Sequence, residues 1–456
     1  MLHYSAKDWH IGDVHPYFER GTLYLFYLKP NGILRCDDCF EDPEKVVTSS
    51  SRLAVTRNYS DWEEYPLPAI ILNLVKLEDT YYCCNGTGEN SFYESRDLIH
   101  WEPSSIYRFE LNNEVFPAGA RDYACFWDHD HNGIRVTMNA YFTNQHNGLG
   151  SGLECCVGIS GVIEKNNSEV PEQHVLLPLD NSGRELMKCM EPECNQMISI
   201  GGRWYLVTSL ARQTVHWVGA PSYWIGDKDI PIDSQNWSQK KEYRLDGEDL
   251  CAAQIAENKG KYYLYGWIPL NYNGQEWGGH LNFPREVYPL ENGLLASRLD
   301  QEFAQSIMGR KTVYGVFAKS AGELGYHIDA EGGLDNFGIK VGFQLSEGTK
   351  TGIILDAAEG TAVLIDTPAE KLRILQLRDG QAVFEYSSID IDVLKEAKLH
   401  VIFDEDIVEV FLNDRYSLCA RVKRTNKAAK VYSFSGNSGE VKSMESYLLK
   451  KPDPIN

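Results

Sequence analysis

Short runs of apolar residues alternate with turns rich in glycine, asparagine and aspartate from about Val14 to about Arg298. The runs carry many aromatic and β-branched side chains, which favour strands over helices. Representative runs are TLYLFYL, AIILNLV, IRVTMNAYF, ECCVGIS, RWYLVTSL and KYYLYGWI. Because no amphipathic helix of usual length interrupts them in the sequence, this part of the chain is expected to be all-β, as a sandwich, a barrel or a propeller.

A weak repeat favours the propeller. The segments NYSDWEEY (58–65) and SRDLIHWEP (95–103) both combine serine, aspartate and a Trp-Glu pair after a strand-like run. Units that recur at the spacing of a blade are typical of propellers. Trp62 and Trp101 are then expected to pack between blades.

The pattern changes near residue 299. LDQEFAQSIMG (299–309) is the best helix candidate and predicts a connector between domains. The runs after it, which include YGVFAKS, TGIILDA, TAVLIDT, LHVIFDE and IVEVFLND, predict strands without the tryptophan motif and favour a second domain, a β-sandwich. We therefore expect a first domain over residues 1–298, a linker over 299–310 and a C-terminal β-sandwich over 311–456.

The composition narrows the possible partners. The 456-residue chain has a net charge of -21, which disfavours binding to nucleic acid or to an anionic membrane surface. Its 26 tyrosines and 10 tryptophans suit a β-rich core and also provide flat faces for stacking on sugar rings. The sequence leaves the oligomeric state open.

The cysteines and the N-terminal sequence predict a compartment. The 11 cysteines include the adjacent pairs Cys83–Cys84 and Cys155–Cys156, which suit free thiols in a reducing cytoplasm better than disulfides. The first residues lack the apolar segment of a signal peptide, and no run has the ~18 apolar residues of a transmembrane helix. The lone CDDC motif (36–39) lacks a second pair at zinc spacing, so we expect a structural loop there, no metal and no cofactor.

Acidic residues stand at the starts of three strand-like runs far apart in the sequence. Asp13 in WHIGDVHP precedes the first run, Arg121 and Asp122 in GARDYACFW precede another, and Glu191 and Glu193 in MEPECNQM precede a third. Aspartate is depleted in strands, so an acid at such a position is either a turn residue or a functional group. In a propeller the innermost strand of every blade lines the central channel, where these acids would converge.

The chemistry that fits such a cluster is hydrolysis of a glycosidic bond. It requires one carboxylate that attacks the sugar or activates water, and one carboxylic acid that protonates the leaving oxygen. The alternative is structural, with Arg121 and Asp122 as an ion pair and Glu193 as a surface acid. The residues alone leave both interpretations open.

In this order, the motifs resemble those of glycoside hydrolase family 32, the β-fructosidases such as invertases, levanases and inulinases. WHIGDVHP stands for the family's Trp-x-Asn-Asp-Pro-Asn-Gly motif, ARDY for its Arg-Asp-Pro motif and PECNQM for its Glu-Cys motif. Further matches are SDWEEY, PSYWIGDKDI, LDGEDLCAAQ, YGWI, WGGHLNFPREV and, in the second domain, VEVFLND (408–414). The resemblance covers nearly the whole chain and implies an N-terminal five-bladed β-propeller followed by a C-terminal β-sandwich.

The resemblance also assigns roles. It implies that Asp13 is the nucleophile, that Glu193 is the acid/base with a raised pKa, and that Asp122 stabilises the transition state. Glu191 is the alternative to Glu193, which we prefer because Cys194 follows it as in the family pattern. Small carbohydrates are the implied partners, and the residues expected at the sugar pocket are Trp9, His10, Arg121, Asp249 and Trp267.

Several positions depart from the family pattern. Gly12-Asp13-Val14-His15-Pro16 replaces Asn-Asp-Pro-Asn-Gly, Tyr123 replaces the proline after Arg-Asp, and Asn195-Gln196 replaces Pro-Asp after Glu-Cys. Hydrogen-bonding positions set specificity steeply, so these changes bear on the sugar more than on the reaction type.

The resulting hypothesis is a cytoplasmic, metal-independent retaining glycosidase for β-fructofuranosides such as sucrose or small fructo-oligosaccharides. Its Asp13 and Glu193 carboxyl groups are then expected about 5–5.5 Å apart, against roughly 6.5–9.5 Å in an inverting enzyme. The alternatives are an inverting furanosidase of arabinanase or xylosidase type and a non-catalytic carbohydrate-binding propeller.

Overall fold

The protein is described here by a computed structural model of the whole chain. The structure describes residues 1–452 except 8, 31–48, 142–154, 168, 180–189, 214–216, 273–275, 315–325, 329–335, 347, 349, 356–358, 380, 424–430 and 436–439. The CDDC motif and most of YGVFAKS lie outside the described residues.

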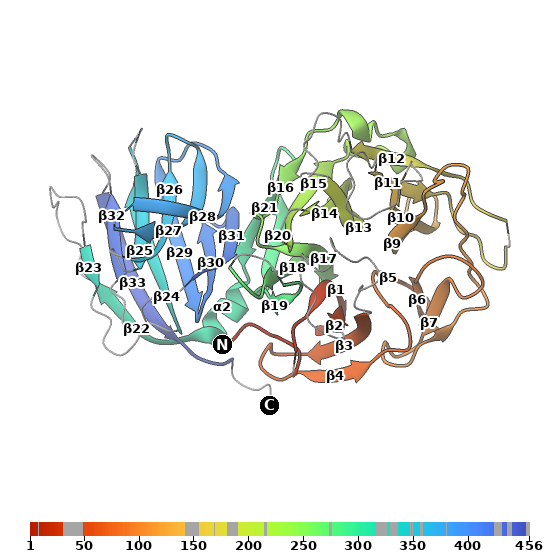
Figure 1. Cartoon of the computed structure of the whole chain (residues 1–456), viewed down its shortest axis with the longest axis horizontal. Coiled ribbons are helices and arrows are strands. Elements are labelled where there is room, and N and C mark those ends of the chain that lie inside the picture. The colour runs from red at the N-terminus through yellow and green to blue at the C-terminus, as the bar shows by residue number, and fades with distance from the viewer. Residues whose placement is uncertain are drawn as a thin grey trace.

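The strands between Gly12 and Leu299 form five antiparallel sheets, which follow one another along the chain (Figure 1). The first two sheets contain β1 (Gly12–Glu19), β2 (Thr22–Pro30), β3 (Ser49–Thr56) and β4 (Glu63–Pro66), then β5 (Leu74–Leu77), β6 (Thr80–Cys84), β7 (Phe92–Ser95) and β8 (Glu102–Pro103). The third contains β9 (Ala120–Asp128), β10 (Gly133–Tyr141), β11 (Cys155–Ser160) and β12 (Gln173–Leu179).

The last two sheets of this domain follow the same plan. The fourth contains β13 (Met190–Ile200), β14 (Arg203–Gln213), β15 (Trp217–Ile225) and β16 (Tyr243–Arg244), with the short 3-10 helices η2 (Ile232–Ser234) and η3 (Trp237–Gln239) before β16. The fifth contains β17 (Cys251–Asn258), β18 (Lys261–Pro269), β19 (Gly279–Leu281), β20 (Arg285–Pro289) and β21 (Leu295–Leu299).

The first strand of each sheet lies at the centre of a ring of sheets (Figure 1). β9 contacts β5 and β13, β13 contacts β17, and β17 contacts β1, so the last sheet meets the first. This arrangement is a β-propeller, and the sequence prediction of an all-β propeller is confirmed. The starts of the inner strands, where the predicted acids stand, therefore share one end of the central channel.

The two copies of the repeat in the sequence, within 58–65 and 95–103, form the same type of turn. Oγ1 of Thr56 accepts the backbone N–H groups of Asn58 and Tyr59, as Oγ of Ser95 accepts those of two residues at the same offsets. In each copy the indole N–H, of Trp62 or Trp101, donates to the carbonyl three residues earlier. Trp101 packs edge-on against Phe26 of the first sheet at 6.0 Å, between blades as predicted, whereas Trp62 stacks at 4.0 Å on Tyr4, which precedes the first strand.

One predicted strand is largely absent. Of AIILNLV, only the end belongs to β5, which begins at Leu74. The backbone N–H of Ile71 donates to Oγ of Ser51 in the first sheet, and that of Leu72 donates to Sγ of Cys83. These side-chain partners replace a neighbouring strand, so Ile71 is buried without strand pairing while Ile70 beside it is exposed.

Helix α2 (Gln301–Ile307) connects the propeller to the second domain. The Asp300 carboxylate caps it by accepting the N–H of Phe303 at 2.8 Å, and Phe303 and Ile307 are buried. The connector helix predicted over 299–309 is therefore confirmed with tighter ends. The predicted domain boundaries stay a prediction; the first strand after the helix begins at Met308.

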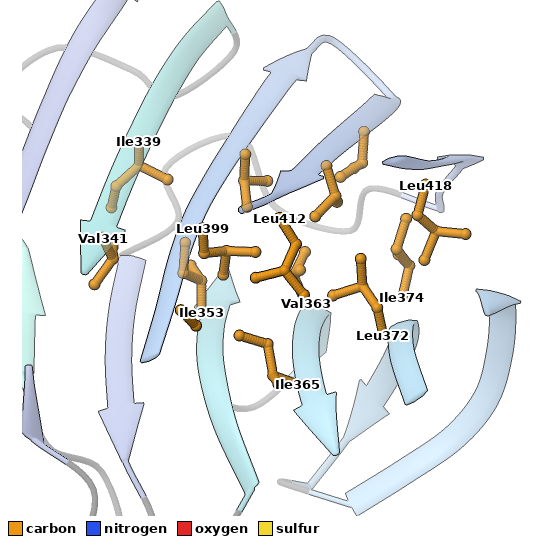
Figure 2. Packing of buried hydrophobic residues seen from close by; sticks show 14 of the residues in the cluster. Ile339, Val341, Ile353, Val363, Ile365, Leu372, Ile374, Leu399, Leu412 and Leu418 are labelled. Carbon is orange, nitrogen blue, oxygen red and sulfur yellow. The ribbon is translucent and has the colours of Figure 1, made fainter. Parts of the chain in front are cut away.

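The C-terminal domain consists of two six-stranded sheets packed face to face (Figure 1). One sheet contains β22 (Met308–Tyr314), β33 (Glu440–Leu449), β24 (Asn336–Gln344), β29 (Glu396–Asp404), β30 (Ile407–Leu412) and β31 (Tyr416–Arg421). The other contains β23 (Tyr326–Ile328), β32 (Val431–Ser435), β25 (Lys350–Leu355), β26 (Glu359–Asp366), β27 (Lys371–Arg378) and β28 (Gln381–Asp390). Aliphatic residues such as Ile339, Ile353 and Leu399 fill the space between them (Figure 2), which confirms the predicted β-sandwich.

A buried network of charges joins the two domains. Arg285 of β20 donates to the Glu409 carboxylate of β30 at 2.6 and 2.9 Å and also pairs with Asp246. His3 lies between Asp404, at 2.7 Å, and Glu409, at 2.9 Å. Burial alone would lower the pKa of His3, but its bonds to the two carboxylates outweigh burial and raise it. Two of the quoted motifs, WGGHLNFPREV and VEVFLND, thus meet at the domain interface.

Within the described parts of the chain, no helix combines the length and the apolar composition that crossing a bilayer requires.

Candidate active site

Four of the five inner strands carry the same β-bulge near their starts. In β1, β9, β13 and β17, two residues oppose a single residue of the neighbouring strand. The first bulged residue has a positive φ in every case: 42° at Asp13, 52° at Asp122, 52° at Cys194 and 47° at Ala252. This backbone conformation is uncommon for residues other than glycine, and its repetition around the channel marks a functional end of the propeller.

Asp13 is half-buried at the first of these bulges. Burial raises its pKa to about 7, with a further contribution from the negative charge of Asp122. The indole N–H of Trp267 and the charge of Arg121 act in the opposite direction and favour the carboxylate. The raised pKa expected for the acid Glu193 stays a prediction, and the predicted nucleophile Asp13 also has a raised pKa.

Gly12 makes room for an aromatic side chain next to Asp13. A Cβ atom at this position would lie 2.3 Å from the ring of Trp277, so only glycine admits the indole there. Trp277 in turn packs against Trp267, with ring centroids 5.9 Å apart. The glycine that replaces the family's asparagine before the aspartate is thus explained by an aromatic contact.

The other two predicted acids meet across neighbouring blades. Nη2 of Arg121 donates to Oε1 of Glu193 at 2.7 Å, and the N–H of Cys194 lies 3.4 Å from Oδ2 of Asp122. Burial raises the pKa of the Cys194 thiol, and the nearby charges of Asp13, Asp122 and Glu193 raise it further. All three acids therefore lie within electrostatic reach of one buried thiol.

The structural alternative expected an ion pair between Arg121 and Asp122, but the ion pair found joins Arg121 to Glu193. The pair with Glu193 is open to solvent, with 40% of the Arg121 and 26% of the Glu193 side chain exposed. An exposed ion pair adds little stability. Glu191 lies in β13, but its side chain is outside the described part of the structure.

One of the predicted sugar contacts, Trp267, lies beside Asp13 at this end of the channel. The Trp9 ring stacks on His10 at 4.8 Å, and Trp267 is 97% buried beside Asp13. The buried indole N–H groups of Trp9 and Trp267 have no acceptor in hydrogen-bonding geometry among the described residues. A buried donor without a partner costs about 1–3 kcal/mol, which a substrate hydroxyl could recover.

Asp249 and His10 lie toward the domain interface. Oδ2 of Asp249 accepts the backbone N–H of Arg421 in β31 at 3.1 Å, and burial raises the pKa of this carboxyl to about 8. Burial also lowers the pKa of His10, and the charge of Arg421 lowers it further. Asp249 is therefore held by the sandwich domain rather than by the acid cluster.

A belt of hydrogen bonds that sequence reasoning missed lies beneath the acids. Nδ1 of His15 bonds to Oδ1 of Asn73 at 3.2 Å, and Nδ2 of Asn73 donates to Oε1 of Gln254 at 2.9 Å. Nε2 of Gln254 donates to the Cys194 carbonyl, while the Cys194 N–H faces Asp122. The belt joins all five blades and holds the bulges in place.

Some of the belt was visible in the sequence. His15 and Gln254 stand in the quoted motifs WHIGDVHP and LDGEDLCAAQ, each two residues after a bulge residue. Their place in these motifs is the signal that could have identified them, because the bulges themselves have no sequence signature. Asn73 has no such signal, because it lies before β5 and meets the others only in space.

In chemical terms, one end of the channel holds three carboxyl groups, a guanidinium and indole N–H donors. This set can attack, protonate and hydrogen-bond a polyhydroxylated substrate. Among the described residues, no group of three or more His, Cys, Asp or Glu side chains could hold a metal ion.

Comparison with known proteins identifies the second domain. Residues 311–447 match the sequence model described as "Glycosyl hydrolases family 32 C terminal". The C-terminal domain belongs to glycosyl hydrolase family 32. The family 32 resemblance predicted from the motifs is thus confirmed. No curated protein sequence matches the chain significantly.

The whole chain shares its fold with several solved structures. A sucrose-6-phosphate hydrolase from Lactobacillus gasseri has a TM-score of 0.67 at 14% identity, covering 98% of this chain and 93% of that one. An exo-inulinase from Aspergillus awamori has a TM-score of 0.65 at 14% identity, covering 98% of each chain. A fructan 1-exohydrolase from Cichorium intybus has a TM-score of 0.66 at 13% identity, covering 99% of this chain and 97% of that one.

Proposed function

We propose that this family 32 protein is a retaining glycoside hydrolase that acts on β-fructofuranosides. The observation that carries the proposal is the convergence of Asp13, Asp122 and Glu193 at one end of the propeller channel, on a chain with the family 32 fold. Asp13 and Asp122 stand at bulge residues with positive φ, and Glu193 directly precedes another, Cys194. Strained backbone beneath carboxyl groups from separate blades is expected where chemistry, and not packing, sets the geometry.

The proposed reaction has two steps. The Asp13 carboxylate attacks the anomeric carbon while the Glu193 carboxylic acid gives its proton to the leaving oxygen, so that the glycosidic bond breaks as the sugar–Asp13 ester forms. Glu193 then takes a proton from water, whose oxygen attacks the same carbon and releases Asp13. Asp122 accepts hydrogen bonds from the sugar hydroxyls beside the reacting centre.

The ion pair between Arg121 and Glu193 fits this cycle in a specific way. A guanidinium at 2.7 Å favours the ionised form of Glu193, whereas the first step requires its acid form. The pair must therefore loosen when the substrate's leaving group enters between the two side chains. In the second step, Arg121 pairs again with the Glu193 carboxylate and stabilises it until it accepts a proton from water.

The proposed substrates are sucrose and small fructo-oligosaccharides. Proteins with this fold have been solved with related sugars: a β-fructofuranosidase from Schwanniomyces occidentalis with fructosyl-erythritol, and a fructan 1-exohydrolase from Cichorium intybus with 1-kestose. The indole N–H of Trp9 has no acceptor among the described residues and is the proposed donor to a sugar hydroxyl, whereas that of Trp267 faces Asp13.

The test is turnover of a panel of fructosides and aryl glycosides by wild type and by Asp13→Ala and Glu193→Ala. Both variants should lose nearly all activity with unchanged circular dichroism, and Glu191→Ala should keep substantial activity. The first-formed product, observed by NMR, should retain its anomeric configuration. An inverted product points to the inverting furanosidase, and no turnover of any glycoside points to a binding protein.

We further propose that the enzyme works in the cytoplasm. Cys83 and Cys84 are adjacent, fully buried thiols, and burial raises the pKa of both well above the ordinary thiol value. Thiol labelling of freshly lysed, denatured cells should modify the cysteines without prior reduction. Labelling that appears only after reduction would contradict this compartment.

A further inference from the structure

Two exposed aromatic side chains from different domains meet where the propeller adjoins the sandwich. Within the described part of the chain, the exposed large hydrophobic residues include three aromatic ones: Trp127, Tyr272 and Phe384. Tyr272, 39% exposed, follows β18 of the propeller, and Phe384, 46% exposed, lies in β28 of the sandwich. Single exposed apolar residues are normal on a protein surface, but a pair that two domains bring together requires an explanation.

A buried third ring holds this pair in place. Tyr272 and Phe384 both pack edge-on against Tyr386, with ring centroids 6.4 and 5.2 Å from its own. Tyr386 is 6% exposed and belongs to the sandwich core, and its hydroxyl oxygen accepts the backbone N–H of Lys423 at 3.0 Å. The three rings therefore form an aromatic platform that is preorganised for a ligand.

The first half of β28 contributes little to the packing of the sandwich. Residues 381–385 are exposed on both faces of this edge strand, and β28 is bulged at two places against β27. Bulges twist an edge strand away from regular pairing, which disfavours a partner that adds a strand here. The exposed ring of Phe384 is available instead to a ligand that stacks on it.

A contact between the domains places the platform at the end of the propeller that carries the acids. Gly247 lies just before β17, whose start has the bulge at Ala252. A Cβ atom at Gly247 would collide with Oγ of Ser387, three residues after Phe384 in β28. The platform therefore adjoins the same end of the channel as the bulges of the inner strands.

The loop after β18 reaches the platform from the other side. Trp267 of β18 lies beside Asp13. Past the end of that strand, the backbone N–H of Leu270 donates to the Gly278 carbonyl at 2.9 Å and closes a loop that contains Tyr272. The residue that contacts the predicted nucleophile and the one that bears the platform thus stand on one short segment of chain.

A second aromatic residue of this loop lies next to the acids. Trp277, near the other end of the loop, packs against Trp267 with ring centroids 5.9 Å apart and is partly exposed. Aromatic side chains therefore lead from Asp13 along the loop to Tyr272 and onto the sandwich domain.

The length of this path indicates which part of a substrate it meets. Because a strand rises about 3.3 Å per residue, Leu270 lies about 10 Å from Trp267. Tyr272, five residues beyond Trp267, lies at most about 18 Å from it. The platform is thus too far away for the sugar ring that Asp13 attacks, but within reach of sugar units beyond the scissile bond.

We propose that the aromatic platform binds the leaving-group side of an oligosaccharide, with a neutral sugar unit stacked on Tyr272 and Phe384. Uncharged aromatic faces suit the C–H face of a sugar ring. The ammonium of Lys423, 5.9 Å from the centre of the Tyr272 ring, is placed to donate to its hydroxyl groups. This inference rests on the proposed function and deepens it, because it favours oligosaccharides over the disaccharide sucrose as the substrate.

The experiment compares sucrose, whose leaving group is one sugar unit, with nystose, whose leaving group has three. Wild type should have the higher kcat/KM for nystose. Tyr272→Ala and Phe384→Ala should each lower kcat/KM for nystose about three- to tenfold, the loss expected for one aromatic contact, mainly through KM. Both should stay within about twofold of wild type on sucrose, and Tyr272→Phe, which keeps the ring, should behave as wild type on both.

Trp127→Ala is the matched control. Trp127 is 38% exposed but stands near the end of β9, away from Asp122 at the start of that strand, so its loss should change neither rate. Circular dichroism checks the fold of every variant. Crystals of Glu193→Gln soaked in nystose should show the outer sugar units against Tyr272 and Phe384.

A wild-type preference for sucrose, equal losses on both substrates, or no loss on nystose in Tyr272→Ala/Phe384→Ala would each overturn the inference and leave the proposed function standing. A wild-type dimer that dissociates in this double variant, observed by analytical ultracentrifugation, would show that the platform is a subunit interface instead. If the wild type turned over no glycoside, the proposed function would fail, and this inference with it.

Discussion

The raised pKa of Asp13 makes a quantitative prediction about stability. A carboxyl group whose pKa moves from its ordinary value of 3.8 to about 7 on folding is harder to ionise in the folded protein than in the unfolded chain. At about 1.4 kcal/mol for each pH unit, ionised Asp13 costs the folded state at most about 4 kcal/mol. Because Asp13 is half-buried and not sealed from solvent, we expect roughly 1–3 kcal/mol.

The sign of the pH dependence follows from the direction of the shift. Below the ordinary pKa both states are protonated and the cost is absent; above the folded-state pKa of about 7 it is fully present. Asp13→Asn removes the charge, so it should raise the free energy of unfolding by roughly 1–3 kcal/mol at pH 8.5 and by about half as much at pH 5.5.

The assay is urea denaturation of wild type and Asp13→Asn at the two pH values. Glu89→Gln makes the same chemical change at an exposed site and should leave the free energy of unfolding within about 0.5 kcal/mol of wild type at both. A gain for Asp13→Asn that does not change with pH, or a loss of stability, would refute the reasoning. The expected gain would mean that Asp13 lowers the stability of the folded protein and is retained for catalysis.

Further predictions concern the neighbours of Asp13 and the domain interface. The rate kcat/KM should fall as the pH drops below about 7, because Asp13 must be ionised to attack, and a rate independent of pH between 5 and 8 would contradict this. Asp122→Asn should move that fall to lower pH, since it removes a charge that raises the pKa of Asp13, and it should lower kcat more than it changes KM. Asn73→Leu leaves His15 and Gln254 each without a hydrogen-bond partner. It should lower the free energy of unfolding, measured by denaturation, by about 1–3 kcal/mol for each of these groups, and it should also lower kcat. Arg285→Met leaves Glu409 buried with less compensation and should destabilise the protein by about 3–5 kcal/mol, measured by thermal unfolding, without a change in KM.

The sequence predicted what depends on local pattern. Short apolar runs and the repeated Trp turn predicted the all-β propeller. The change near residue 299 to a helical segment, and then to strand-like runs without the Trp motif, predicted the connector helix and the sandwich. The acids could be located because aspartate and glutamate are unusual at the starts of strands. Each of these signals lies within about ten residues of the feature it predicts.

What the sequence did not predict depends on register and on distant contacts. A bulge adds one residue to a strand without any required residue type, so the positive φ of Asp13 and Cys194 has no local signature. Asn73 joins the belt across 181 residues of sequence, and Asp249 turns toward a strand of the other domain. The apolar run before β5 misled the prediction because hydrophobicity alone does not show which hydrogen-bond partners the backbone will have.

The position of His3 has a consequence for how the protein is made. The ring nitrogens of this residue bond to two carboxylates that stand 401 and 406 positions later in the chain. The ribosome must therefore add a further 401 residues after His3 before the contact of this residue with Asp404 can form. Contacts of such long sequence separation form late and slowly. The segment around His3 must stay soluble and unattached during that time, and its contacts with the second domain form only afterwards.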